Sequence, residues 1–540
     1  MKKFSKLAAI LAVCAFIFGG LLVSCSPHGT GYGLDDGQSA GSGGSGGAGG
    51  GSGNPGDGGG SGGGSPKTAG SISYATTSVE KNIGDAAFTN PLTKTGDGVV
   101  VYGSSDANVA TVDTATGEVT IKAVGTTTIR ATVSDSEAYT YETKSASYTL
   151  EVKNPVTIPL TLEFIAAGKI NFINKPATLK YSFDGGETKA DASEDSITVS
   201  AGGKVSLFAE TTGSTEFKPF KISCDADCYV YGNVMSLVTL TSSGEWNPNA
   251  RELASEYAFY QLFYVDGNKI KNHPSNNLVL PATTLTRSCY RWMFYGCTGL
   301  TRAPALPATT LVRFCYNAMF KGCASLTSAP ALPATTLASN CYSDMFSGCT
   351  GLKSAPALLP ATTLAQSCYN SMFKGCASLT SAPALPATTL AEYCYSAMFS
   401  GCTGLTSAPA LLPATTLAEG CYSFMFKACA SLTSAPALLP ATMLARDCYN
   451  GMFEGCTSLT KAPDLPATTL ADHCYQQMFS GCTALNEIKC LATDISAGEC
   501  TTGWVEGVAA NGTFTKASGM TGWTTGADGI PSGWTSQDAN

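Results

Sequence analysis

The sequence contains few of the residues that most active sites use for acid–base chemistry or metal binding. Only three histidines occur in 540 residues, namely His28, His273 and His473, and they are far apart in the chain. The numerous cysteines occur mainly as pairs, and a pair of thiolates lacks the other two ligands that a tetrahedral zinc site needs. We therefore expect no catalytic residue, no metal site and no cofactor.

Charged side chains are also scarce, and long apolar runs are almost absent. Asp, Glu, Lys and Arg make up 13% of the chain, and the net charge is −8. Nucleic-acid-binding domains carry a basic patch or stripe, which this sequence lacks, so we expect no nucleic acid partner. The one long apolar run extends from Leu7 to Val23, directly after Lys2, Lys3 and Lys6.

This N-terminal pattern is typical of an export signal. The apolar run ends in Leu22-Val23-Ser24-Cys25, which resembles a bacterial lipobox. A short membrane anchor or a plain cleaved signal peptide is the alternative, although the run is marginal in length for a membrane span. We expect residues 1–25 to be a lipoprotein signal and Cys25 to carry the lipid, so that its acyl chains anchor the exported chain to the cell envelope.

The composition changes between this signal and the centre of the chain. Residues 26–68 are rich in Gly and Ser, so little apolar surface can offset the entropy cost of ordering them, and a flexible tether is predicted. Residues 70–153 and 157–250 alternate apolar and polar side chains between turn residues. This alternation predicts two β-sandwich modules.

One phrase then recurs eight times in residues 280–485. It reads L-P-A-T-T-L-x-x-x-C-Y-x-x-M-F-x-G-C-x-x-L-T-x-A-P-A, with a period of 26 or 27 residues. A fixed period of this length indicates a solenoid, whose units stack because none can bury its own apolar face. Residues 251–279 and 486–540 resemble degraded repeats and are expected to cap the two ends, the second with a short β closure.

Within one copy the apolar spacing favours a short helix. In the fifth copy, C-Y-x-x-M-F (Cys394–Phe399) places apolar side chains at i, i+1, i+4 and i+5, and Thr388 or Thr389 could cap the helix. A stub of strand is expected at Leu405-Thr406-Ser407-Ala408. The predicted fold is therefore multi-domain, with immunoglobulin-like β-sandwich modules followed by an α/β leucine-rich-repeat solenoid.

A glycine follows the predicted helix in seven copies, as Gly401 does in the fifth. Glycine at the end of a helix commonly adopts positive φ. The sixth copy has Ala428 instead, which would cost roughly 1 kcal/mol if the position is left-handed.

Two segments resemble known families. The repeat resembles the core of BspA-like leucine-rich-repeat surface proteins in the residues Met398, Phe399, Gly401, Cys402, Leu405 and Thr406. The segment from Tyr102 to Thr132 resembles the bacterial immunoglobulin-like group 2 domain. The resemblances imply a surface protein linked to adhesion, host or cell–cell interaction, and together with the lipobox they imply an outer-membrane lipoprotein that faces outward.

Most of the 22 cysteines belong to the repeats, as pairs eight residues apart such as Cys394 and Cys402. Export would permit disulfides. Both repeat positions also suit a small buried hydrophobic residue, so buried free thiols are the favoured interpretation. Outside the repeats, Cys224 and Cys228 could form a bridge across a turn.

The solenoid offers two candidate contact surfaces. The first is the hydroxyl-rich row after the repeated leucine, represented by Arg302, Ser328, Lys353, Ser381, Ser407, Ser434 and Lys461. The second consists of variable positions around the predicted helix, represented by Trp292, Phe314, Tyr393 and Phe424. We expect the solenoid to bind a protein or glycan of a host or neighbouring cell. The alternative is a structural or antigen-varying surface-coat protein without a specific ligand.

Overall fold

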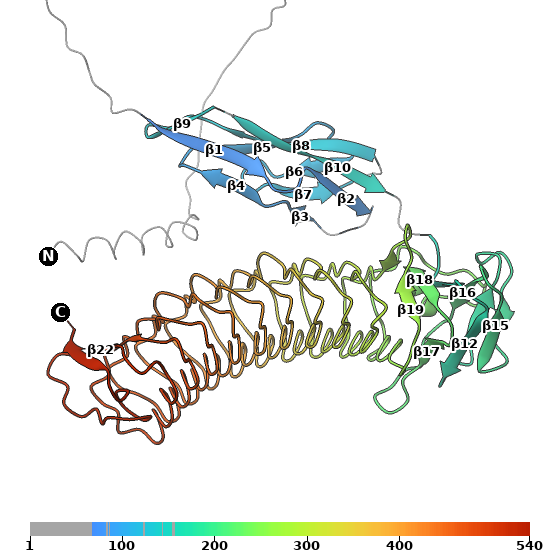
Figure 1. Cartoon of the computed structure of the whole chain (residues 1–540). Coiled ribbons are helices and arrows are strands. Elements are labelled where there is room, and N and C mark those ends of the chain that lie inside the picture. Colours follow the sequence, from blue (N-terminus) through green and yellow to red (C-terminus); the bar gives the residue numbers. More distant parts are fainter. Residues whose placement is uncertain are drawn as a thin grey trace, which may run out of the picture. The chain divides into compact units, whose positions relative to one another are not determined.

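The computed structural model describes residues 67–82, 85, 87–122, 125–142, 144–153 and 157–539. The predicted signal peptide, Cys25 and nearly all of the predicted tether lie outside these residues. In the described part of the chain the one helix is a short 3-10 turn, η1 (Val234–Leu237), and all other elements are strands or turns (Figure 1). No helix there has the length and apolar character that a membrane crossing requires.

The first module is built from short strands in three sheets around its own apolar core. Its strands are β1 (Thr68–Tyr74), β2 (Ser78–Asn82), β3 (Phe88–Thr89), β4 (Leu92–Thr95), β5 (Val100–Ser104), β6 (Ala110–Val112), β7 (Glu118–Ile121), β8 (Gly125–Val133), β9 (Tyr139–Tyr141) and β10 (Ser145–Lys153). The sheet orders are β4-β1-β9, β2-β10-β8-β5 and β3-β7-β6. Alternate residues of β8 and β10, such as Ile129 and Leu150, are buried, so the alternation seen in the sequence is confirmed.

The second module shares one continuous apolar core with the repeats. Its strands are β11 (Thr161–Phe164), β12 (Gly168–Ile173), β13 (Lys180–Ser182), β14 (Ala190–Asp191), β15 (Ser196–Val199), β16 (Lys204–Phe208), β17 (Lys221–Cys224), β18 (Cys228–Asn233), β19 (Ile270–Asn272) and β20 (Leu278–Val279). The strands form a sheet of order β14-β13-β16-β11-β18-β19, with β20 also on β18, and a sheet of order β15-β12-β17. β19 and β20 belong to the predicted cap repeat and pair with β18, so backbone pairing joins the second module to the cap repeat.

Each repeat forms one rung, and the segment predicted as a helix is a series of turns instead. The amide of Met398 donates to Tyr395 O three residues earlier (3.2 Å), whereas that of the next residue, Phe399, donates to Met425 O in the following rung (2.9 Å). This alternation continues along the segment, so half of its amides bond within the rung and half between rungs. The α/β prediction for the solenoid is therefore wrong.

The error has a physical cause in the period of the apolar pattern. An α-helix has 3.6 residues per turn, whereas C-Y-x-x-M-F-x-x-C repeats every four. Across the eight residues from Cys394 to Cys402 a helix would turn about 80° too far to keep both cysteines on one side. The chain instead places every fourth residue in the left-handed region, as at Tyr393, Ala397 and Gly401 (φ 52°, 51° and 75°).

The residues expected to cap the helix and to form the strand stub make single β-bridges. Thr389 pairs in parallel with Thr363 of the previous rung, so its predicted capping role is also wrong. Ser407 pairs with Ser381 and Ser434 on its two sides, which confirms the brief extended segment after the repeated leucine. Ala428 has φ 58°, so the position is left-handed even where glycine is missing.

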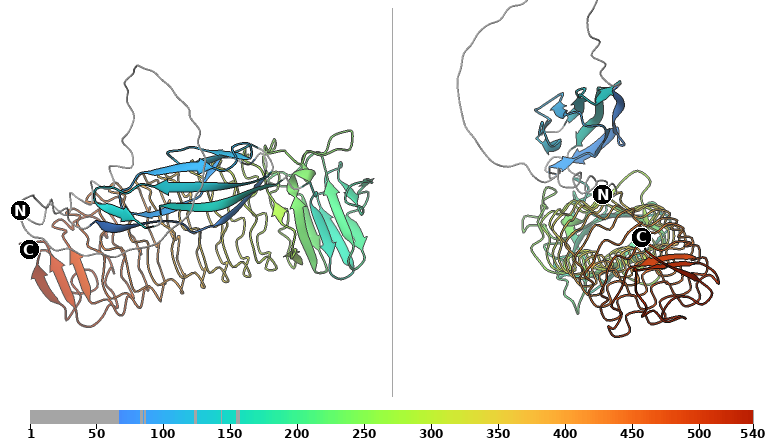
Figure 2. Two further views of the ribbon diagram at one scale, coloured as in Figure 1. Left: turned by 90° about the horizontal axis from the view of Figure 1, so that it is seen from above. Right: turned by 90° about the vertical axis from the view of Figure 1, so that its left-hand side faces the viewer.

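Identical side chains stack in columns inside the solenoid. The repeat tyrosines, such as Tyr369 and Tyr395, lie parallel with ring centroids 5.7 Å apart, and Phe373 and Phe399 do the same at 5.7 Å. Seen from the C-terminal end, the rungs follow one behind another with a progressive offset (Figure 2, right). The expected interior of Tyr, Met, Phe, Leu and Cys is confirmed, since these repeat side chains are almost fully buried.

The repeat cysteines are buried free thiols, as the favoured interpretation predicted. The second cysteine of a rung donates to a phenylalanine carbonyl of the rung before it, as Cys402 Sγ does to Phe373 O (3.0 Å). This bond explains why a weak thiol donor, rather than an aliphatic side chain, fills the column. Cys224 and Cys228 are also free thiols in this structure.

The two ends of the stack continue the same register with different residues. At the N-terminal end the amide of Phe259 donates to Cys289 O (2.7 Å), so residues 258–263 form a rung before the first full repeat. At the C-terminal end β21 (Glu487–Cys490), β22 (Thr513–Lys516) and β23 (Thr535–Asp538) form a parallel sheet of order β21-β22-β23. The indole ring of Trp504 stacks on Tyr475 and ends the tyrosine column.

Candidate functional site

The predicted hydroxyl-rich row is exposed and forms one side of the rungs. All seven of its predicted residues, Arg302, Ser328, Lys353, Ser381, Ser407, Ser434 and Lys461, are exposed. We call this row the bridge face, because Ser328 bridges Ser354, Ser381 bridges Ser407, and Ser407 bridges Ser434. Lys353 lies one residue before its bridging neighbour Ser354 and is therefore out of register with the other six.

The charged ends of the bridge face are already occupied within the chain. Arg302 donates through Nη2 to His273 O (2.5 Å), in the loop between the second module and the first full repeat. Lys461 forms an ion pair with Glu487 at 2.5 Å. What remains is Lys353 and a row of Thr, Ser and Ala side chains that hardly varies from rung to rung.

A second surface, which we call the turn face, differs in sequence from rung to rung. It consists of the outward residues of each turn segment, namely the two residues before the first cysteine and the third residue after it. In the fifth rung these are Glu392, Tyr393 and Ala397, which are exposed or half-buried, whereas Cys394 and Met398 beside them are fully buried. The interior repeats from rung to rung, and the turn face differs.

Four bulky aromatic residues occupy left-handed positions of the turn face. They are Trp292, Phe314, Tyr393 and Phe424, with φ of 57°, 58°, 52° and 55°. Left-handed backbone costs roughly 1–2 kcal/mol for a residue with a Cβ, and glycine or asparagine would adopt it more easily. These aromatic side chains are thus kept at the surface in spite of a conformational cost.

Two of these rings lie against the next rung at positions where the sequence has glycine. A Cβ at Gly420 would lie 2.3 Å from Cε1 of Tyr393, and a Cβ at Gly451 would lie 2.4 Å from Cδ1 of Phe424. The hydroxyl of Tyr393 also donates to Glu419 Oε1 (2.7 Å). Each aromatic residue and the glycine beneath it therefore form a matched pair.

The first rungs carry a cluster of aromatic rings and arginines. The Arg291 guanidinium lies 4.6 Å from the ring centroid of Trp292 and 5.2 Å from that of Phe314. It also lies 3.8 Å from the Glu216 carboxylate of the second module, which accepts a hydrogen bond from the Tyr257 hydroxyl. The cluster thus ties the second module to the first rungs while leaving its rings half-exposed.

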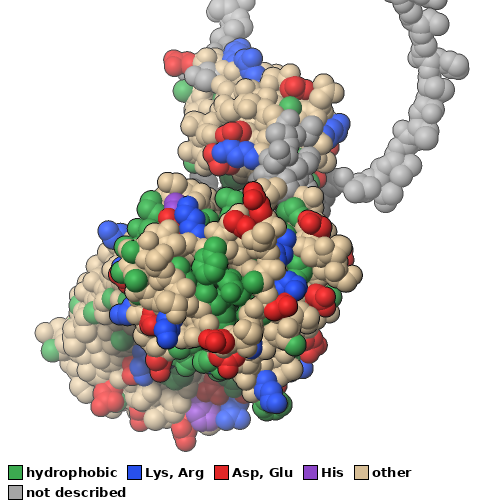
Figure 3. All heavy atoms as spheres, turned by 90° about the vertical axis from the view of Figure 1, so that its right-hand side faces the viewer, with side chains coloured by type: hydrophobic (Ala, Val, Ile, Leu, Met, Phe, Trp, Pro, Cys, Tyr) green, Lys and Arg blue, Asp and Glu red, His purple; other side chains and the backbone are tan. Residues whose placement is uncertain are grey.

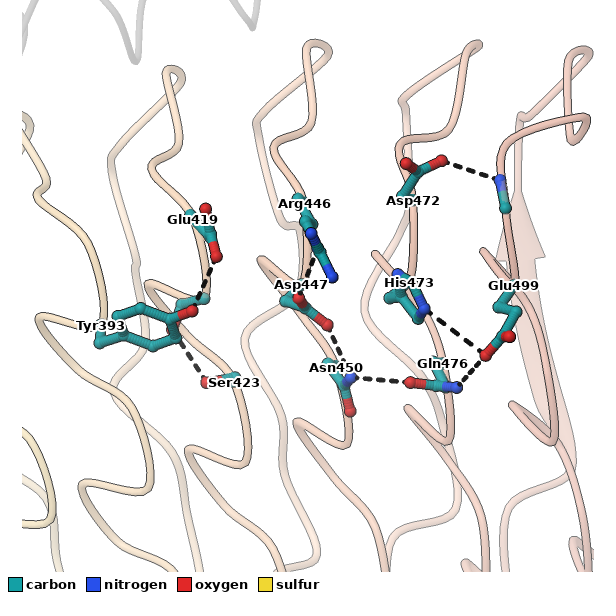
Figure 4. A network of polar contacts seen from close by, with 12 residues as sticks. Tyr393, Glu419, Ser423, Arg446, Asp447, Asn450, Asp472, His473, Gln476 and Glu499 are labelled. Atoms are coloured by element: carbon teal, nitrogen blue, oxygen red, sulfur yellow. Dashed lines mark hydrogen bonds and ion pairs between the residues drawn. The ribbon is translucent and has the colours of Figure 1, made fainter.

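A polar network crosses the last rungs of the turn face (Figure 4). Asn450 Nδ2 donates to Asp447 Oδ1 (2.9 Å) and to Gln476 Oε1 (3.0 Å), and Gln476 Nε2 donates to Glu499 Oε2 (3.0 Å). His473 Nε2 lies 3.5 Å from the same Glu499 oxygen. These side chains hold one another in place across three rungs, which presents an ordered surface.

The described residues offer neither a cluster of metal ligands nor an activated thiol among the repeat cysteines. No group of three or more His, Cys, Asp or Glu side chains among them could hold a metal ion. Burial raises the pKa of the Cys394 thiol to about 12, so the reactive thiolate is disfavoured. An open cleft of about 620 Å³ lies beside the C-terminal sheet and is lined by polar residues such as Asn486, Asn511 and Gln537.

The end of the molecule at which the second module lies has a mixed surface. Figure 3 shows acidic and basic side chains interspersed there around a central hydrophobic area. Phe217 is the most exposed large hydrophobic side chain of this module, at 90% exposure. We find no charge of one sign gathered on this face.

Comparisons with known proteins identify two regions of the chain. Residues 270–406 and 316–460 match the family model of the BspA type leucine rich repeat region, and residues 91–135 match that of the intimin immunoglobulin-like domain. A leucine-rich repeat protein from Bacteroides ovatus ATCC 8483, known from a crystal structure, is 17% identical. That match covers 45% of this chain and 75% of that chain, with a TM-score of 0.20. No curated protein matches the chain.

Proposed function

We propose, from the premise that residues 270–460 are a BspA type leucine-rich repeat region, that this chain is a lipid-anchored cell-surface protein whose solenoid binds a macromolecule. The partner would be a protein or glycan of a host or a neighbouring cell, and the turn face would contact it. The lipid on Cys25 would anchor the chain to the membrane.

The observation that carries the proposal is the contrast between the interior and the turn face. The buried positions keep the same residue from rung to rung, which is what a scaffold needs. The left-handed surface positions instead carry Trp292, Phe314, Tyr393 and Phe424 at a conformational cost. Aromatic residues are enriched among the residues that dominate binding energy in interfaces, and stability alone would favour glycine there.

A second candidate function is a surface-coat protein without a specific ligand. The uniform bridge face favours it, because rungs of nearly identical Thr, Ser and Ala residues supply few of the differences that define a shaped ligand site. The two candidates differ in whether the turn face is needed.

A binding assay on the full chain separates them. The wild type, a turn-face variant (W292A/F314S/Y393S/F424A) and a bridge-face variant (S328A/S381A/S407A/S434A) are tested against immobilised matrix proteins and glycans. The turn-face variant introduces residues that other rungs carry at the same positions, such as Ala318 and Ser367. We expect one ligand class to lose at least tenfold affinity for the turn-face variant alone. Uniformly weak binding by all three chains would favour the coat protein.

The anchor is tested separately in cells of a lipoprotein-processing bacterium. Cys25→Ser removes the thiol that would receive the lipid, so the chain should leave the membrane fraction, while Cys14→Ser should leave it anchored. Protease treatment of intact cells should cleave the wild type if it faces outward. Retention of C25S in the membrane would rule out the lipid anchor.

A further inference from the structure

Charge is distributed unevenly along the repeat region. Residues 280–380 contain seven Lys and Arg against one acidic residue, whereas residues 381–539 contain five Lys and Arg against twelve Asp and Glu. A surface that only needs to be soluble intersperses both signs. Here the first half of the stack is basic and the second half is acidic.

This polarity is sharpest in one column of the turn face, formed by the residue two positions before the first cysteine of each rung. Backbone hydrogen bonds fix the register of the column, as from Tyr257 N to Arg287 O (3.0 Å) and from Gly420 N to Arg446 O (3.0 Å). From the N-terminal cap rung to the seventh full rung the column reads Glu256, Arg287, Arg313, Ser339, Gln366, Glu392, Glu419 and Arg446. All eight side chains are exposed or half-buried.

The charges of this column are arranged so that the column complements a second copy of itself running in the opposite direction. Suppose that a second copy lies antiparallel, with its fourth rung opposite the third rung of the first copy. Every charged residue of the column then faces a residue of opposite charge. The pairs are Glu256 with Arg446, Arg287 with Glu419, Arg313 with Glu392, and Ser339 with Gln366. No like charges meet anywhere in the column.

The aromatic residues obey the same symmetry in the neighbouring columns. In the column next to the first cysteine, Phe314 of the second rung falls opposite Tyr393 of the fifth. In the column of the second left-handed residue, Trp292 of the first rung falls opposite Phe424 of the sixth. Aromatic rings attract one another in offset or edge-to-face arrangements, so the strained rings gain a partner by this arrangement.

Four charges of the column lack an ion-pair partner within the described part of the chain, whereas Arg446 is paired with Asp447 (3.2 Å). Glu392 and Glu419 accept hydrogen bonds from the neutral side chains of Gln366 and Tyr393. Within the described residues no ion pair joins Arg287, Arg313, Glu392 or Glu419 to an opposite charge, although other charges of the repeats are paired, such as Lys321 with Asp344 (2.9 Å). Each like-charged pair sits on adjacent rungs, where the two side chains repel each other. A second copy would relieve both repulsions.

We infer that the turn face binds the turn face of a second copy of this chain, antiparallel, about a twofold axis between the third and fourth rungs. The pairing rests on the proposed function, since it uses the same face and names the partner. The interface is isologous, so every pair occurs twice and the assembly closes as a dimer. Eight rungs span about 34 Å at strand spacing, which buries on the order of 1,000 Å², the size range of weak and transient interfaces.

Charge reversal in the full chain tests the pairing by analytical ultracentrifugation. We expect the wild type to dimerise with a Kd in the micromolar range that rises with salt. R287E/R313E and E392R/E419R should each raise the Kd at least about 100-fold, because the pairs become repulsive. An equimolar mixture of the two variants should restore the dimer, because every reversed column then faces its complement. A matched bridge-face reversal, K353E/K461E, should leave the Kd unchanged.

Two results would overturn the inference. One is a wild type that stays monomeric to several hundred micromolar, and the other is a dimer that both reversals leave intact. A mixture that fails to reassociate while circular dichroism shows both variants folded would also overturn it. Failure of this pairing can be distinguished from failure of the proposed function. The test of the proposed function uses immobilised foreign ligands, and its aromatic variants keep the charge column intact.

Discussion

One position that is glycine in seven of the eight rungs has left-handed backbone, and this predicts that a glycine substitution in the remaining rung stabilises the chain. In a helical solenoid the same substitution would destabilise it. Ala428 has φ 58° at the position where the fifth rung has Gly401, with φ 75°. We predict that Ala428→Gly stabilises the chain and that Gly401→Ala destabilises it by a similar amount. A helix interior would give the reverse order, since glycine costs about 1 kcal/mol relative to alanine there.

The magnitude follows from two opposing contributions. Left-handed backbone costs roughly 1–2 kcal/mol for a residue with a Cβ. Glycine's greater freedom in the unfolded chain returns about 0.4–1 kcal/mol of this. No clash adds to the cost, because a Cβ at Gly401 would lie 3.7 Å from Gly375 Cα, an ordinary contact. The net effect is therefore about 1 kcal/mol in each direction.

Denaturant unfolding followed by circular dichroism measures both variants against the wild type, with the slope of the transition checked for equality. A change of about 1 kcal/mol corresponds to about 2–4 °C in Tm for a cooperative unit of 150–250 residues. Loss of stability in A428G, or a neutral G401A, would refute the left-handed register at this position.

Three further predictions concern buried groups and surface pairs. Tyr369→Phe should raise the free energy of unfolding by about 1 kcal/mol, because the buried hydroxyl has no hydrogen-bond partner among the described residues; a decrease would reveal a hidden one. Burial raises the pKa of thiols such as Cys394 to about 12, above the value of about 9 in the unfolded chain. The free energy of unfolding should therefore be highest below about pH 9 and should fall between pH 9 and 12. A urea midpoint that stays constant from pH 8 to 11 would contradict this. Gly420→Ala should cost more than Gly401→Ala, since its Cβ would meet the Tyr393 ring at 2.3 Å, and Tyr393→Ser should recover the difference.

Much of the solenoid could be predicted because its interior is periodic in the sequence. The 26- or 27-residue period identified the stacking, and the repeated Tyr, Met, Phe, Leu and Cys identified the core. Alternation identified β8 and β10 in the first module in the same way. Side-chain burial follows from periodicity alone, so these predictions needed no knowledge of the backbone path.

The local conformation of the turn segment could not be predicted by the same means. A stripe at i, i+1, i+4 and i+5 fits both a 3.6-residue helix and a four-residue turn over one or two turns. The distinguishing signal was the second cysteine at i+8, which a helix would move off the stripe, as between Cys394 and Cys402. The choice is then decided by hydrogen bonds to the next rung, which one isolated repeat cannot contain.

The candidate site was only partly visible in the sequence. The four aromatic residues of the turn face stood out as interruptions of the repeated phrase. Their partners Gly420 and Gly451 did not, since an extra glycine in a glycine-rich repeat attracts no notice. The reason for these glycines is steric and involves Tyr393 and Phe424 of the preceding rung, which lie close in space only after the rungs are stacked.

The same stacking explains how the turn face can vary without loss of the fold. Every amide of the turn segment is satisfied by a backbone carbonyl of its own rung or of the next, as for Met398 and Phe399. Surface side chains therefore carry no part of the register, and a column such as Arg287, Arg313, Glu392 and Glu419 can be set by a partner instead. Since these like charges repel within one chain and form no ion pair with its described residues, their ordered alternation is best explained by a surface that meets its own complement.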